Sequence, residues 1–96
     1  MADPDPSVLE RCWSRAPGVD AVTLDGEAVL YQSPHGRLHV LNTSATLVWE
    51  CLDGTVTGAE LSDELAQAFG VDRDTMTAQV DSVLETFYSE GLIVPT

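Results

Sequence analysis

The chain has 96 residues, of which 44% are hydrophobic, and its formal net charge is −12 at pH 7. This length and apolar content suffice for one small domain around one core and exclude a protein with two cores. Only four residues are basic, all of them arginines. The chain therefore has few of the groups with which proteins bind phosphates, and we expect no nucleic-acid partner. No apolar run is long enough to cross a bilayer and no signal peptide opens the chain, so we expect a cytoplasmic protein without a membrane partner.

Residues 1–18 are expected to form an N-terminal arm, partly disordered, ahead of a domain that spans residues 19–94. Three prolines interrupt the arm, and residues 1–6 are typical of a loose tail. Residues 7–15 fit either a short helix or an extended segment that lies over the domain. Trp13 is expected to anchor this arm on an apolar surface. That surface belongs either to its own core or to a second copy, so a monomer and a homodimer both remain open.

The domain begins with a pattern typical of three strands in an antiparallel meander. Alternating apolar residues predict strands over residues 19–24, 27–32 and 37–41. Asp25-Gly26 favours a tight hairpin between the first two strands, and residues 33–36 supply Pro and Gly for the second turn. The third strand is expected at an edge of the sheet. Its alternation places Leu38 and Val40 on one face and Arg37, His39 and Leu41 on the other.

The apolar period changes from 2 to 3.6 at Asn42, whose side chain suits the N-cap of a helix over residues 43–52. Gly54 accepts the left-handed conformation without steric cost, so we expect it to end this helix. The expected buried stripe of this helix is Ala45, Val48, Trp49 and Leu52.

Two further helices follow. Thr57 and Glu60 form the pattern of a capping box for a helix over residues 58–69, and Asp72 can cap a third helix over residues 73–89. A short apolar segment near the end of the chain is consistent with one more strand. Three strands followed by three helices, with a helix-turn-helix in the middle, predict an α+β, winged helix-turn-helix-like fold. The expected apolar stripes are Leu61, Leu65, Ala68 and Phe69 in the second helix and Met76, Val80, Val83, Leu84, Phe87 and Tyr88 in the third, where the stripe is wide for one small core.

Four short motifs punctuate the domain. They are a Leu41-Asn42 helix entry, a Leu52-Asp53-Gly54 stop, a Thr57-x-x-Glu60 restart and a closing Gly91-Leu92-Ile93. As a set they resemble the PqqD family, which includes the pyrroloquinoline quinone biosynthesis chaperone and the recognition elements of ribosomally made, modified peptides (RiPPs). The similarity covers about residues 19–94. It implies a small protein that binds the leader segment of a precursor peptide and presents it to a modifying enzyme, without singling out one precursor system. We expect no cofactor.

The resemblance also implies where the peptide binds: as an added strand beside the third strand, against the third helix. An edge strand offers the unpaired N–H and C=O groups that such strand addition uses. Met76 and Val83 are the better groove candidates on the helix, and the flexible Met76 thioether suits an adaptable surface. Val80, Leu84 and Phe87 fit a plain core equally well. The expected peptide-binding residues are Arg37, Leu38, His39, Val40 and Leu41 on the strand and Met76, Gln79, Val80, Val83 and Phe87 on the helix.

Other functions have less support in the sequence. His35 and His39 are four residues apart on a turn and a strand without an evident third ligand, so we expect no metal site. No catalytic triad or phosphate-binding glycine loop is evident, and the two cysteines, expected as free thiols, lack redox spacing, so we expect no enzyme. A winged-helix DNA-binding regulator needs a basic recognition helix, but residues 58–69 contain no Lys or Arg. An acyl-carrier-like protein needs its phosphopantetheine serine at a helix start, whereas Ser82 is expected in mid-helix.

Overall fold

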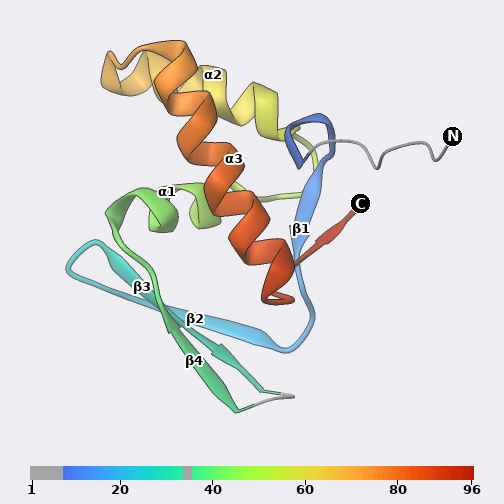
Figure 1. The fold of residues 1–96 in the computed structure, drawn as a ribbon. Coiled ribbons are helices and arrows are strands. Elements are labelled where there is room, and N and C mark those ends of the chain that lie inside the picture. The colour runs from blue at the N-terminus through green and yellow to red at the C-terminus, as the bar shows by residue number, and fades with distance from the viewer. Residues whose placement is uncertain (1–7, 34–35) are drawn as a thin grey trace, which may run out of the picture.

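The structure is a computed structural model that describes residues 8–33 and 36–96. Its three α-helices lie together on one side of a three-stranded antiparallel sheet, which confirms the expected α+β, winged-helix-like class (Figure 1). His35 and the expected loose tail, residues 1–6, lie outside the described residues. No helix in the described part of the chain is long and apolar enough to span a membrane. The elements are η1 (Val8–Glu10), β1 (Trp13–Arg15), β2 (Val19–Leu24), β3 (Glu27–Gln32), β4 (Arg37–Val40), α1 (Thr43–Cys51), α2 (Gly58–Phe69), α3 (Arg73–Ser89) and β5 (Ile93–Pro95).

The predicted N-caps are present. The Asn42 side chain accepts from the Ala45 N–H at 2.8 Å at the start of α1. Thr57 and Glu60 form the full capping box of α2, with bonds of 3.1 and 2.9 Å. The expected end of α1 was wrong in detail, because the helix ends at Cys51 in an extended cap at Leu52. Gly54 is left-handed as expected (φ 84°), but it lies beyond the cap and its N–H donates to the Trp13 carbonyl at 3.0 Å, which ties the chain to β1.

The core forms where α1 and α3 pack over β3. Trp49 of α1 meets Phe87 of α3 edge to face, with ring centroids 5.7 Å apart, and Leu30 of β3 is fully buried beneath the helices. The predicted face of α2 needs one correction: Ala66 is buried beside Leu61 and Leu65, whereas Ala68 and Phe69 are exposed. The reason is that the last turn of α2 extends past the core.

The N-terminal arm belongs to the domain's own core. Trp13 is 2% exposed, its Nε1 donates to the Val8 carbonyl at 2.8 Å, and its ring lies 5.1 Å from that of Tyr88. The arm is both a short helix and an extended segment, η1 followed by β1. β1 pairs antiparallel with β5, with Trp13 opposite Pro95, so the expected last strand pairs with the arm and not with the meander (Figure 1).

Candidate functional site

The strand β4 lies at an edge of the three-stranded sheet, whose order is β2-β3-β4. Its register with β3 places Leu38 opposite Tyr31 and Val40 opposite Val29. Leu38 and Val40 point away from the helices and are 68% and 73% exposed, whereas Leu41, just after the strand, is buried. One side of the β4 backbone is therefore paired to β3, and the other side remains open along the edge among the described residues.

A groove runs from the end of β4 along α3. A cavity of about 580 Å³ lies between the end of β4, the start of α1 and the middle of α3. Gln79 and Val83 form its wall on α3, and Ser44 contributes from α1. The full lining is Val40, Leu41, Asn42, Ser44, Ala45, Ala78, Gln79, Ser82, Val83, Thr86 and Phe87.

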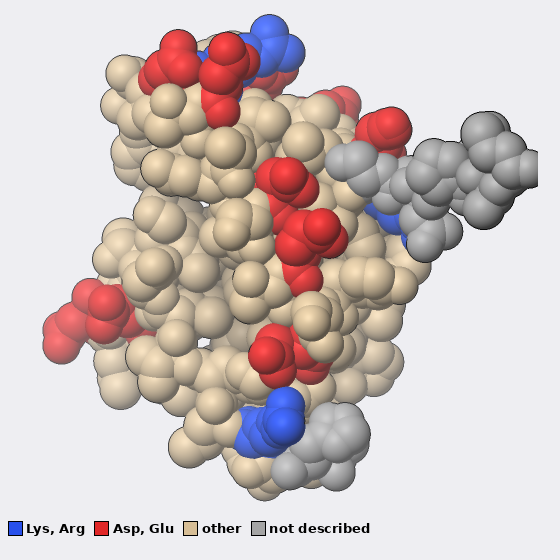
Figure 2. Space-filling view, viewed as in Figure 1, with Lys and Arg blue, Asp and Glu red and all other residues tan. Residues whose placement is uncertain are grey.

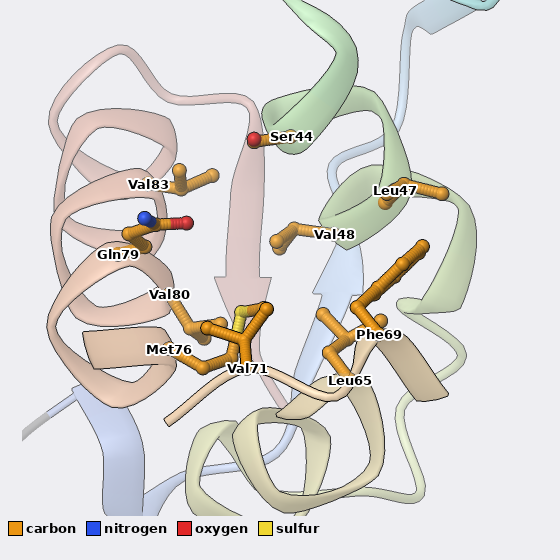
Figure 3. A pocket seen from close by; sticks show the side chains of 10 residues that line it. All are labelled: Ser44, Leu47, Val48, Leu65, Phe69, Val71, Met76, Gln79, Val80 and Val83. Atoms are coloured by element: carbon orange, nitrogen blue, oxygen red, sulfur yellow. The ribbon is translucent and has the colours of Figure 1, made fainter. Parts of the chain in front are cut away.

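A second cavity, of about 300 Å³, continues the groove toward the start of α3. It shares Ser44, Gln79 and Val83 with the first cavity, so the two are adjacent, and we call them together the channel. Figure 3 shows side chains from all three helices converging on it. None of the residues that line either cavity carries a charge, which is notable in a chain with a net charge of −12. The residues that line the second cavity are Ser44, Leu47, Val48, Leu65, Phe69, Val71, Met76, Gln79, Val80 and Val83.

The structure divides the predicted helix residues into two groups. Val80 and Phe87 are core residues that form only the floor of the groove, and Met76 is also buried. Gln79 is exposed and Val83 half-buried, so these two residues form the accessible wall. The sequence left open whether Val80 and Phe87 belong to the core or to the groove. The structure buries nearly all of both side chains in the core.

The predicted strand residues also separate. Val40 and Leu41 line the first cavity, whereas Arg37, Leu38 and His39 line neither cavity and lie along the edge strand. Sequence reasoning missed the part of the channel contributed by α1 and the end of α2. The one signal for it was a pair of large apolar residues, Phe69 and Val71, on either side of the helix-ending Gly70.

A polar cluster ties the start of β4 to the end of α3. The buried Gln32 side chain donates from Nε2 to the carbonyl of Glu90 at 3.2 Å, and its Oε1 lies 3.2 Å from His39 Nε2. Because an amide oxygen only accepts, His39 Nε2 is the donor in this pair. Arg37 forms an exposed ion pair with Glu90 at 3.2 Å. These contacts fix the distance between the edge strand and the helix at this end.

The described residues contain no group of three or more His, Cys, Asp or Glu side chains placed to hold a metal ion. Both cysteines are free. Partial burial, and then the nearby Glu64 and Glu50 carboxylates, raise the pKa of the Cys51 thiol above its usual value. At neutral pH this thiol is therefore protonated, which is the unreactive form.

The fold and the channel define a small winged-helix-like domain with an open strand edge beside an uncharged groove. The chain belongs to the PqqD family, because residues 27–93 match the family described as coenzyme PQQ synthesis protein D (PqqD). This confirms the resemblance found in the sequence.

Two solved structures share the fold. One is TbiB1 in complex with the TbiA(beta) leader peptide, with a TM-score of 0.75 and 21% sequence identity, covering 83% of this chain and 93% of that chain. The other is a lasso peptide synthetase B1 complexed with the leader peptide, with a TM-score of 0.76 and 19% identity, covering 86% of this chain and 98% of that chain. No curated protein matches the chain.

Proposed function

We propose that this protein is a non-catalytic recognition protein that binds the leader segment of a ribosomally made precursor peptide and presents it to a modifying enzyme. The observation that carries the proposal is the open edge of β4 beside an uncharged channel. Membership of the PqqD family supports it. The two structures of the same fold, both complexes with leader peptides, support it further.

The leader would add as a strand antiparallel to residues 37–41. Backbone hydrogen bonds along β4 would supply affinity without regard to sequence, and the channel would supply specificity through apolar side chains. In this arrangement Gln79 and Val83 contact the peptide directly. Met76, Val80 and Phe87 act from below, as the floor on which an apolar side chain rests.

The chemistry that this protein would assist belongs to its partner. The groove offers no ionisable side chain that could transfer a proton, and the exposed thiol at the end of α1 is held in its protonated form. We therefore assign no reaction to this chain itself, and we place its role in the cytoplasm, where precursor peptides are made.

The test is a titration of isotope-labelled protein with a candidate precursor peptide. Amide signals of Leu38 to Leu41 and of Met76 to Val83 should shift. Val83→Asp should weaken binding by about 2–4 kcal/mol, because it places an unpaired charge in an apolar groove. Ala59→Asp, on an exposed position in the first turn of α2, adds the same charge away from the groove and should bind like the parent.

Circular dichroism must first show that the Val83→Asp variant is folded. Shifts confined to α2, or a folded variant that binds the precursor as tightly as the parent, would contradict the proposed site.

A further inference from the structure

The outer face of the three-stranded sheet, which faces away from the helices, is apolar and uncovered among the described residues. The strand register forms a row across the sheet from Val22 through Val29 to Val40, and Tyr31 and Leu38 are opposite one another beside it. Val22 and Leu24 are 60% and 62% exposed. The large exposed apolar residues of this face, which we call the outer face, are Val22, Leu24, Tyr31, Leu38 and Val40.

Acidic residues lie beside this apolar centre, on the β2 edge and at the β2-β3 hairpin. Asp20 is opposite Tyr31 in the register and Glu27 is opposite Leu24, and Asp25 occupies the hairpin turn next to them. The one basic residue of the sheet strands, Arg37, is already paired with Glu90. A partner surface that fits the outer face therefore has an apolar centre and basic residues where it meets β2 and the hairpin.

A second copy of this chain does not meet that description. Two copies packed through their outer faces would bring together two molecules that each carry a net charge of −12, with no basic residue among the described ones on either face to offset the repulsion of the acidic side chains. The area is also small. Three strands about 4.8 Å apart and at most six residues long span a few hundred Å², whereas a stable interface buries about 800 Å² per partner, so any stable partner must also contact surface beyond these three strands.

We propose that the outer face is the docking surface for the modifying enzyme, which meets it with an apolar patch that has basic residues beside it. This inference rests on the proposed function. A leader strand added to β4 would extend the same face by one strand, because Leu38 and Val40 are the residues at that edge. The enzyme then contacts this chain and the outward side chains of the leader together, so leader binding and enzyme binding strengthen each other.

The test compares substitutions at one exposed position, Val22, in the reaction reconstituted from this chain, the precursor and the modifying enzyme encoded with it. Val22→Lys should weaken binding of the enzyme to the leader-bound chain by about tenfold or more, because it removes apolar contact and places a cation against basic residues. Val22→Glu should weaken it less. Ala21→Lys puts the same charge on the opposite face of β2 and should behave like the parent.

Leader affinity is measured separately for each variant by fluorescence anisotropy. It should stay within about twofold of the parent, since β2 is separated by β3 from the edge that takes the leader. Enzyme binding that Val22→Lys leaves unchanged, or that Val22→Glu weakens more than Val22→Lys does, would overturn the proposal. A parent dimer that Val22→Lys converts to a monomer would also overturn it, in favour of a second copy. Failure of the parent to bind the leader would instead count against the proposed function.

Discussion

The Thr46 hydroxyl connects α1 to the sheet through a buried hydrogen bond. Thr46 is 2% exposed, and its Oγ1 accepts from the backbone N–H of Ala28 at 2.9 Å. Thr46→Val keeps the shape of the side chain but leaves that N–H unsatisfied in the core. We expect a loss of about 1–3 kcal/mol in the free energy of unfolding, measured by urea denaturation.

Thr43→Val is the matched control, because Thr43 lies on the same helix but is exposed. It should change the free energy of unfolding by less than about 0.5 kcal/mol. Equal stability of Thr46→Val and Thr43→Val would show that the hydroxyl is not needed.

The residues that could be predicted from the sequence are those whose partners are local. Asn42, Thr57 and Asp72 cap their helices through N–H groups three residues away, so the pattern of side chains is sufficient to identify them. Thr46 could not be identified, because its partner is 18 residues away. The contact of Arg15 with Trp49, whose ring centroid lies 5.0 Å from the guanidinium carbon, is likewise set by the tertiary fold.

At the scale of elements, the arm formed by η1 and β1 should contribute to stability although it precedes the family match. Trp13→Ala removes a buried indole together with its hydrogen bond to Val8 and its contact with Tyr88. We expect it to lower the free energy of unfolding by about 3–5 kcal/mol. Trp13→Phe retains a ring and should cost less. An unfolding midpoint of Trp13→Ala equal to that of the parent would show that the arm lies outside the cooperative unit.

The meander and the three helices follow from their hydrophobic periods, which differ between strands and helices. The pairing of β1 with β5 could not be predicted, because three-residue strands from opposite ends of the chain carry almost no periodic signal. The sequence predicted the wide apolar stripe of α3, but it did not show which of these residues face the core and which face the groove. Different sides of this helix face the core, the groove (at Val83) and Trp13 (at Tyr88). Which side faces which neighbour depends on the tertiary fold.

At the scale of the whole molecule, the acidic side chains lie outside the channel. Acidic side chains are spread along α3 and elsewhere on the face shown in Figure 2, with few basic ones, while the channel lining is neutral. We therefore expect long-range attraction to act on a basic precursor before contact, and apolar contacts to hold it afterwards. Salt screens this attraction, and the Debye length is already about 8 Å at physiological salt. Raising the salt concentration should therefore lower the association rate constant and change the dissociation rate constant little, as measured by stopped-flow fluorescence.

A precursor whose basic residues are replaced by neutral ones is the control, and its association rate should depend less on salt. A salt dependence carried mainly by the dissociation rate would mean that charged contacts persist in the complex.

The pairing of β1 with β5 has a consequence for how this domain can be joined to other proteins. The Thr96 N–H donates to the Cys12 carbonyl at 3.1 Å, so β5 ends beside the start of β1, which η1 directly precedes. In Figure 1 this place lies on the other side of α3 from α1, where the groove begins. A polypeptide attached through either end would start on this side of α3, across the helix from the proposed peptide groove. We therefore expect that a fusion ahead of or behind an enzyme leaves the proposed groove uncovered in both cases.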